Sequence, residues 1–226
     1  MARRRFLKLA ATYGAVGPLA AVLQRGPDIG APALIRARGD AARPNVVLAV
    51  TDALRSDHVS ANGYGRSVTP NLDRWIAAEG VTFRQAATAS PWTFPANAAL
   101  MTGRLPFRFN ATWDNTVLPA SALTLAEILR QNGYLTAGFV AAPFVRAAPH
   151  GFGQGFQVYD DSVSYKGVLE SSGLSAQLNV AAQSWLASWS PGPQPLFLFL
   201  YYFDPHTFTT RRRLTIRFMI PATPAR

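Results

Sequence analysis

The chain has 226 residues, of which 49% are hydrophobic, and a formal net charge of +10. This length and composition allow one substantial hydrophobic core and exclude a disordered polymer of charged residues. The sequence contains no cysteine, which excludes disulfide bridges, thiolate metal ligands and a cysteine nucleophile.

The basic charge is concentrated at the two ends of the sequence. Residues 1–43 carry eight basic and two acidic side chains, and residues 208–226 carry five basic ones. Between these ends nine basic residues face ten acidic ones, so the central part has a net charge near −1. Because this central part shows no basic surface interleaved with aromatic residues, we expect no nucleic-acid partner.

The N-terminus has the layout of an export signal. Arg3, Arg4 and Arg5 precede an apolar run over residues 9–23, which is too short and too rich in glycine and alanine to favour a stable membrane span. The paired arginines followed by Phe-Leu-Lys resemble a bacterial twin-arginine signal, which implies a periplasmic or extracellular location. An amphipathic helix on a cytoplasmic protein is the alternative. We interpret residues 1–43 as a signal peptide and linker.

From Asn45 onward, strand-like apolar segments alternate with helix-like segments. The first predicted strand covers residues 46–51 and is apolar at nearly every position, as in a strand buried on both faces. The further elements that we expect, in chain order, are a helix over 69–80, a short strand over 81–83, a helix from 93–95 to 103, a helix over 123–132 ended by Gly133, a strand over 136–140, a helix over 174–189 and a strand over 196–203. This alternation predicts an α/β fold with a mostly parallel sheet between two helix layers.

Polar residues follow two of the predicted strands directly. Asp52 ends the first strand, and Asp204 and His206 follow the last one. In an open α/β sheet, ligands bind beyond the carboxyl ends of the strands. Thr93 opens a predicted helix, where backbone N–H groups and the helix dipole favour an anion. These positions are therefore the first candidates for a functional site.

A series of short motifs occurs in order between residues 43 and 207. They are Arg43-Pro44-Asn45-Val46-Val47-Leu48, Asp52 to His58, Thr69 to Phe83, Ser90 to Gly103, Leu125 to Val140, Gly151 to Phe156, and Asp204-Pro205-His206. In this order they resemble the opening part of bacterial sulfatases, which belong to the alkaline phosphatase superfamily. The resemblance implies an incomplete three-layer α/β/α fold like that of alkaline phosphatase, and a metal-dependent hydrolase of sulfate or phosphate esters.

The resemblance also implies a metal site. In sulfatases the aspartate after the first strand binds a divalent metal, usually calcium, so Asp52 and Asp204 are the metal-ligand candidates here, with manganese or zinc as other candidate ions. Ala53 stands where the family often has a second aspartate, and a hard cation needs several oxygen ligands. As an alternative, Asp52 caps a loop and pairs with Arg55.

The family nucleophile lies in the pattern Cys-x-Pro-Ser-Arg and is converted to formylglycine. Thr93-Phe94-Pro95-Ala96-Asn97 occupies these positions, and we expect no formylglycine because threonine cannot give that aldehyde. Threonine is the nucleophile in phosphodiesterase relatives of the superfamily, which makes Thr93 the catalytic candidate for attack on a phosphoester. The alternative is that Thr93 only caps the helix.

Other positions complete the implied site. His206 matches the family histidine that contacts the substrate or leaving group, and Arg55 and Asn97 are the substrate-binding candidates, Asn97 in place of the family arginine. For His58 and His150 a surface or core role is expected. Residues 140–144 lack the Lys-Trp-His segment of many sulfatases, which argues against strict sulfatase activity. We expect Asp52, Thr93 and Asp204 to cluster at one edge of the sheet.

The sequence changes character after Thr207. We interpret residues 44–207 as a partial sulfatase-like N-terminal domain and residues 208–226 as an aberrant basic tail. A frameshift near Thr207 is one explanation, and a solvated basic tail is the other. Because sulfatases continue well beyond this point, we expect the chain to be impaired as a fragment. A non-catalytic relic or binding module with the same fold is the alternative function, and the sequence does not indicate an oligomeric state.

Overall fold

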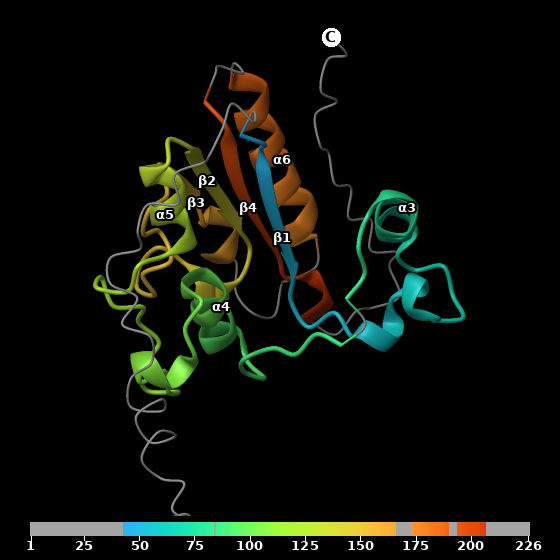
Figure 1. Cartoon of the computed structure of the whole chain (residues 1–226), viewed down its shortest axis with the longest axis horizontal. Helices are drawn as coiled ribbons and strands as arrows, with labels where there is room; N and C mark the ends of the chain where they lie inside the picture. Colours follow the sequence, from blue (N-terminus) through green and yellow to red (C-terminus); the bar gives the residue numbers. More distant parts are fainter. Residues whose placement is uncertain (1–42, 84, 166–172, 190–193, 207–226) are drawn as a thin grey trace, which may run out of the picture. The chain divides into compact units, whose positions relative to one another are not determined.

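The computed structural model describes residues 43–83, 85–165, 173–189 and 194–206 (Figure 1). The predicted signal peptide and linker, apart from Arg43, and the predicted basic tail lie outside the described residues. Within the described ranges, no helix is long and apolar enough to cross a membrane.

The described strands form one parallel sheet in the order β1-β4-β2-β3 (Figure 1). The strands are β1 (Val46–Thr51), β2 (Leu135–Val140), β3 (Val158–Asp160) and β4 (Leu196–Tyr202). The last strand in the sequence, β4, lies between β1 and β2, with Thr51 opposite Tyr202 and Val140 opposite Tyr201. The predicted parallel sheet is therefore confirmed. Sequence reasoning missed β3, which is only three residues long.

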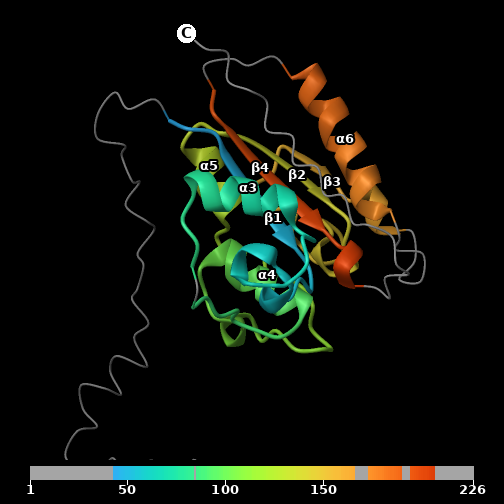
Figure 2. The same cartoon turned by 90° about the vertical axis from the view of Figure 1, so that its right-hand side faces the viewer.

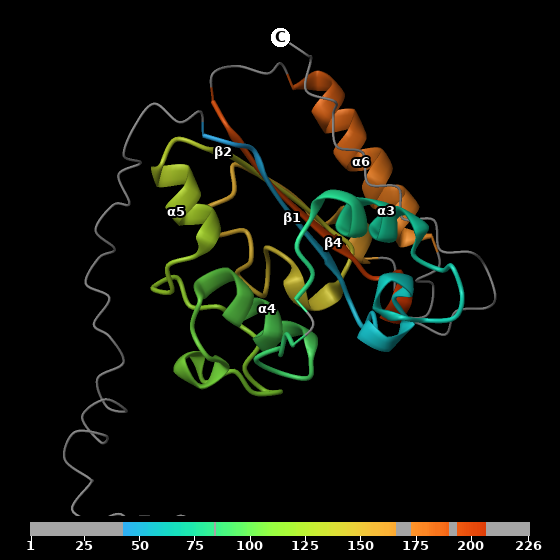
Figure 3. The same ribbon diagram turned by 45° about the vertical axis from the view of Figure 1, so that its right-hand side comes forward.

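Helices cover both faces of this sheet. The helices α4 (Thr93–Thr102) and α5 (Leu125–Gln131) lie on one face, and α6 (Leu174–Ser188) lies on the other (Figures 2 and 3). This is the predicted three-layer α/β/α arrangement. A further helix, α3 (Pro70–Glu79), packs against the 3-10 turn η2 (Ser60–Asn62), and its bounds agree with the predicted helix over 69–80.

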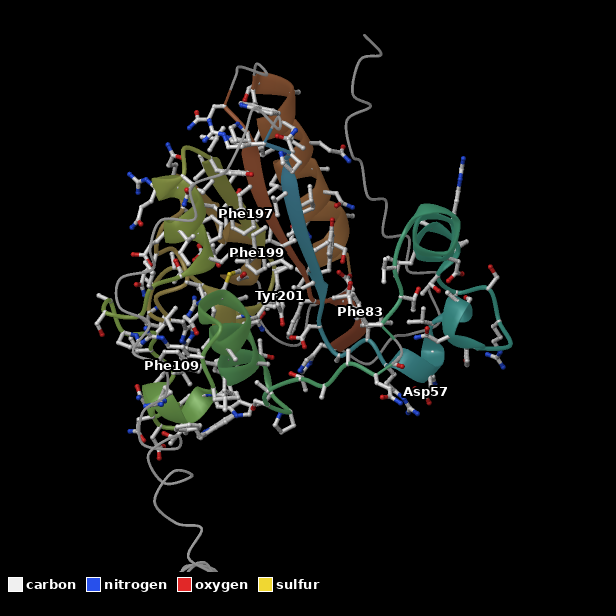
Figure 4. The ribbon with its side chains drawn as sticks, in the orientation of Figure 1. Asp57, Phe83, Phe109, Phe197, Phe199 and Tyr201 are labelled. Atoms are coloured by element: carbon white, nitrogen blue, oxygen red, sulfur yellow. The ribbon has the colours of Figure 1, made fainter. Side chains whose placement is uncertain are left out.

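The core is built around β4, whose seven residues are all buried. Phe197, Phe199 and Tyr201 follow one another along one face of the strand (Figure 4). Phe156 stacks on Phe197 and Phe199 with ring centroids 5.7 and 6.1 Å apart. Burial of such large aromatic rings is a main source of folding stability, at about 25 cal/mol per Å² of apolar surface.

Two strand predictions were wrong. The first strand, β1, is not buried on both faces: its burial alternates along most of its length, and Val47 is 42% exposed. Residues 81–83 form no strand, and Val81 and Phe83 are each 78% exposed. A local apolar sequence does not make a strand without a neighbour to pair with.

The helix α5 begins two residues later than predicted because Thr124 caps it. The hydroxyl of Thr124 accepts a hydrogen bond from the backbone N–H of Glu127 at 3.1 Å, and the Glu127 carboxylate accepts one from the Thr124 N–H at 2.8 Å. This reciprocal pair is a capping box. Two residues, 123 and 124, therefore belong to the preceding turn.

The Gly151–Phe156 motif has a packing role in the fold. Gly155 has φ +82°, and a Cβ atom there would lie 2.3 Å from the backbone nitrogen of Glu127. Only glycine combines this backbone conformation with so close an approach to the start of α5. The Thr124 hydroxyl also donates to the carbonyl of Gln154 at 3.2 Å. The motif thus fixes the loop between β2 and β3 against α5.

Candidate active site

A hydroxyl and a carboxylate meet where β1 ends and α4 begins. The backbone N–H of Asp52 donates to the carbonyl of Tyr202 at 2.9 Å, which extends the pairing with β4 by one residue. Thr93 is the first residue of α4, and its Oγ1 donates to Oδ2 of Asp52 at 3.1 Å. Both side chains are partly exposed. The pair has the geometry of a nucleophile beside a base at the carboxyl edge of a parallel sheet.

The start of α4 leaves Thr93 free of a capping role. The N-cap residue is Trp92, which makes no side-chain capping hydrogen bond, and the hydroxyl of Thr93 faces Asp52 instead. The alternative that Thr93 only caps the helix is therefore wrong. Because α4 is ten residues long, its first backbone N–H groups and its dipole provide positive potential beside this hydroxyl.

Asn97 and Tyr201 support the pair from inside the protein. The amide nitrogen of Asn97 donates to the carbonyl of Thr93 at 2.8 Å and to the phenol oxygen of Tyr201 at 3.1 Å. Asn97 is only 4% exposed, so its two N–H donors serve these internal contacts, and its predicted contact with substrate stays a prediction. Its Oδ1 has no hydrogen-bond partner among the described residues.

Sequence reasoning missed Tyr201. Burial raises the pKa of Tyr201 far above its usual range, the negative charge of Asp52 raises that pKa further, and the hydrogen bond from Asn97 lowers it in part. The phenol therefore stays neutral, and its oxygen accepts a hydrogen bond from Asn97. The signal that could have found it is the strand period, because β4 ends level with Asp52 and one of its last residues must face α4.

Asp204 lies on the opposite face of the sheet. Its carboxylate accepts hydrogen bonds from the backbone N–H groups of Gly173 and Ser175, at 2.8 and 2.6 Å, and from the hydroxyl of Ser175. It is 6% exposed and occupies the N-terminus of α6, where a carboxylate is favoured. The expected cluster of three residues is thus corrected, because the structure brings Asp52 and Thr93 together and commits Asp204 to α6.

The other predicted contact residues lie at the surface. Arg55 forms an ion pair with Asp57 at 2.7 Å, with the two side chains 68% and 63% exposed, and this contact lowers the pKa of Asp57. Arg55 thus pairs with Asp57, and not with Asp52 as the alternative held. His206 is exposed and stacks on the Phe203 ring at 4.6 Å. Roles for Arg55 and His206 toward a substrate stay predictions.

The two remaining histidines have the expected surface and core positions. His58 is exposed and stacks on Tyr64 with ring centroids 4.7 Å apart. His150 is 7% exposed, and its Nδ1 lies 2.8 Å from the carbonyl oxygen of Thr116. Neither histidine contacts Asp52 or Thr93 among the interactions of the described residues.

Aromatic side chains flank the start of α4. The Trp92 ring lies 5.6 Å from that of Trp113 and 6.1 Å from that of Phe144, measured between centroids. Trp113 is 75% exposed. The residue that precedes Thr93 is thus held in an aromatic cluster that reaches the surface.

A divalent metal would need more ligands than this site supplies. No group of three or more His, Cys, Asp or Glu side chains lies together among the residues that the structure describes. Asp52 is the carboxylate at the site, and the next position is Ala53. Hard cations take six or more oxygen ligands. The described residues alone therefore do not fit the cation that the resemblance implies, and no chemical step is assigned to one.

The fold is a three-layer α/β/α arrangement with a hydroxyl–carboxylate pair at the carboxyl edge of its parallel sheet. The family model for sulfatases matches residues 44–217. The chain therefore belongs to the sulfatase family. The match begins at the predicted domain start and runs past Thr207.

Curated sulfatases show the same relationship over a shorter segment. The chain is 38% identical to human steryl-sulfatase over 108 residues, which cover 43% of this chain and 18% of that protein. It is 35% identical to an ulvan-active sulfatase of Formosa agariphila over 95 residues, covering 42% of this chain and 18% of that protein. The matched segment thus spans about a fifth of these relatives.

Solved structures share the fold over most of the described chain. A phosphonate monoester hydrolase of Agrobacterium radiobacter aligns with TM-score 0.58 and 22% identity, over 73% of this chain and 42% of that one. A protein of the alkaline phosphatase superfamily from Vibrio parahaemolyticus aligns with TM-score 0.51 and 21% identity, over 75% and 43%. The predicted alkaline-phosphatase-like fold is confirmed, and the chain spans less than half of these structures.

Proposed function

We propose that the chain is a hydrolase of sulfate or phosphate esters in which Thr93 is the nucleophile and Asp52 the base. The observation that carries the proposal is the 3.1 Å hydrogen bond from Thr93 Oγ1 to Asp52 Oδ2 at the N-terminus of α4. A nucleophile and its base must lie within such hydrogen-bond reach. Family membership supports the reaction class.

In the proposed reaction, Asp52 accepts the proton of the Thr93 hydroxyl as Oγ1 attacks the sulfur or phosphorus atom. The bond from that atom to the ester oxygen breaks, and the alcohol leaves with a proton. His206, exposed just after β4, is the candidate donor of that proton. A water molecule then gives a proton to His206 as it displaces the threonine oxygen, Asp52 returns its proton to Oγ1, and sulfate or phosphate is released. The first N–H groups of α4 stabilise the negative charge during both steps.

Phosphate esters are the preferred substrates in this proposal. Asn97 stands where sulfatases resembling this chain carry an arginine, and both of its N–H donors are used inside the protein. The Lys-Trp-His segment is also absent from residues 140–144. We expect slow turnover, because one carboxylate at the described site does not by itself hold a cation. The assay therefore includes calcium, manganese or zinc in separate arms.

The proposal includes export from the bacterial cytoplasm. Its support is the charged start Arg3-Arg4-Arg5 followed by the apolar run over residues 9–23. Fusion of residues 1–43 to a folded reporter is expected to send the reporter to the periplasm, and replacement of Arg3 and Arg4 by lysine is expected to stop this. Unchanged export of the double-lysine fusion, measured by cell fractionation, would remove the twin-arginine interpretation.

The test compares hydrolysis of aryl phosphate and aryl sulfate esters by the full chain and by variants of α4. Thr93→Ala should lower kcat by about a thousandfold or more, whereas Thr93→Ser should retain activity. Thr102→Ala is the matched control, because its hydroxyl bonds to the carbonyl of Ala98 at the other end of the helix. Equal activity of Thr93→Ala and the unchanged chain would refute the proposal. Phosphate binding without turnover under any cation would favour the binding-module alternative.

A further inference from the structure

Both members of the Thr93–Asp52 pair are tied to neighbouring residues of β4. Asp52 is held by the hydrogen bond from its backbone N–H to the carbonyl of Tyr202 at 2.9 Å. Thr93 is held through Asn97, whose Nδ2 lies 2.8 Å from the carbonyl oxygen of Thr93 and 3.1 Å from the phenol oxygen of Tyr201. Because all seven residues of β4 are buried, this strand is a close-packed frame for two residues that lie 41 positions apart in the sequence (Figure 4).

The side chain of Asn97 has an orientation that its partners determine. A carbonyl oxygen only accepts hydrogen bonds, so the atom of Asn97 beside the Thr93 carbonyl must be the amide nitrogen. The amide oxygen Oδ1 has no hydrogen-bond partner among the described residues, although Asn97 is only 4% exposed. A buried acceptor without a partner lowers stability. An apolar side chain at position 97 would avoid this loss, so stability alone does not account for the asparagine.

We propose that Asn97 is a positioning residue, which holds the Thr93 hydroxyl against the Asp52 carboxylate and does so with a loss of folding stability. The inference rests on the proposed function. The two N–H donors of Asn97 link the first turn of α4, which contains Thr93, to β4. Without this link the turn can shift relative to the end of β1, and a misplacement of about 1 Å can lower a rate about 100-fold. The loss should appear in kcat rather than in KM, because both donors are used inside the protein.

A second asparagine provides a matched control. The Nδ2 of Asn132 also donates to the carbonyl oxygen four residues earlier, that of Ile128, at 2.8 Å. Asn132 follows α5 and precedes β2, so it lies toward the amino edge of the sheet, opposite to the site. Asn97→Leu and Asn132→Leu therefore delete the same kind of hydrogen bond at two places. Tyr201→Phe is a milder test variant, because it removes only the phenol oxygen to which Asn97 donates.

The experiment measures kcat and KM for aryl phosphate hydrolysis and determines crystal structures of the full-chain variants. Asn97→Leu and Tyr201→Phe should each lower kcat about 10- to 100-fold, with KM changed less than about twofold. In both structures the Thr93 hydroxyl should lie beyond hydrogen-bond reach of Asp52. The double variant should lose no more activity than the single ones, because both changes break one link. Asn132→Leu should match the unchanged chain in kcat and in the Thr93–Asp52 contact.

Thermal unfolding provides a readout that separates positioning from packing. The double variant Asn97→Leu/Tyr201→Phe removes the amide and the phenol oxygen together, so the unpaired Oδ1 disappears and neither partner is left without the other. Its melting temperature should equal that of the unchanged chain or exceed it by up to about 4 °C, although its kcat is low. A packing role predicts instead that kcat and melting temperature fall together.

Three results would overturn the inference. An unchanged Thr93–Asp52 contact in both single-variant structures would exclude positioning, whether or not the chain turns over substrate. A raised KM with unchanged kcat in Asn97→Leu would assign Asn97 to substrate binding. An equal loss of kcat in Asn132→Leu, or a lowered melting temperature of the double variant, would reduce Asn97 to a packing role. Failure of the proposed function is recognised separately, because Thr93→Ala would then have the activity of the unchanged chain.

Discussion

The two faces of the sheet carry the same kinds of polar contact beside the end of β4, but with different consequences. On each face a buried tyrosine of β4 bonds to an asparagine of the covering helix, and a hydroxyl bonds to an aspartate. The contacts are Tyr201–Asn97 and Thr93–Asp52 on the α4 face, and Tyr202–Asn179 and Ser175–Asp204 on the α6 face.

The two faces differ in the other hydrogen bonds that the aspartate accepts. Asp204 is buried and accepts two backbone N–H groups at the start of α6, so it closes a helix terminus. Asp52 is partly exposed and accepts a hydrogen bond from the hydroxyl of Thr93, so it leaves the N–H groups of α4 to another ligand. The same pair of side-chain types is therefore structural on one face and available for chemistry on the other.

Replacing each aspartate by alanine should give the largest difference between the two faces in the free energy of unfolding. Asp204→Ala removes the acceptor of two backbone N–H groups and of the buried Ser175 hydroxyl, and should lower the free energy of unfolding by about 3 kcal/mol. Asp52→Ala should cost about 1 kcal/mol or less, because water reaches its site. Urea unfolding followed by circular dichroism measures both values. Equal losses would show that Asp52 is also a structural carboxylate.

Ionisation of Tyr202 should make the folded state less stable at high pH. Burial raises the pKa of Tyr202 from 10.0 to about 12, so between these values the folded state keeps a proton that the unfolded state loses. The contribution of Tyr202 to the free energy of unfolding is therefore fully present below pH 10. It falls by about 1.4 kcal/mol for each pH unit between pH 10 and about 12. Tyr202→Phe should make this decline shallower in pH-dependent urea unfolding.

A pH titration of tyrosinate absorbance tests Tyr201 on the α4 face. The charge of Asp52 adds to burial in raising the pKa of Tyr201. Asp52→Ala should therefore let Tyr201 ionise at lower pH, visible as an earlier rise in tyrosinate absorbance, whereas Asp204→Ala should leave the Tyr201 titration in place. An identical titration in the Asp52→Ala protein and the unchanged chain would contradict the effect of the Asp52 charge on the pKa of Tyr201.

The hydroxyl partners should show the smallest effect. Ser175→Ala removes a buried hydroxyl from Asp204 and should cost about 1 kcal/mol of unfolding free energy. Thr93→Ala should cost less than about 0.5 kcal/mol, because Thr93 lies in the first turn of α4 without capping it. Thermal and urea unfolding of the two variants give the comparison. A larger loss for Thr93→Ala would assign it a structural role.

Much of the fold could be predicted because strong local patterns coincide with the tertiary arrangement. The apolar run that became β4 and the helix ended by Gly103 were found from the sequence within a residue or two. The exposure of one face of β1 could not be found, since it depends on which elements cover that face of the sheet. The capping box at Thr124 moved one helix start, and the three residues of β3 were too few to form a pattern.

The candidate site could be predicted only in part, for a related reason. Strand ends and helix starts identified Asp52 and Thr93, and their contact follows from the parallel sheet. Asp204 follows a strand in the same way, yet its carboxylate is used by α6, which no local pattern reveals. Tyr201 was hidden inside an apolar strand, because its role depends on the face that it presents to α4.

The central claim is that the Thr93 hydroxyl, oriented by Asp52, is the reactive group of this chain. Treatment of the full chain with an aryl phosphonofluoridate, followed by peptide mass mapping, tests this most directly because the reagent forms a stable ester with an activated hydroxyl. We predict modification at Thr93, slowed at least tenfold in Asp52→Ala and unchanged in Asp204→Ala. Modification at Ser175 or Thr102 with Thr93 unlabelled, or equal labelling rates in the two aspartate variants, would contradict the account.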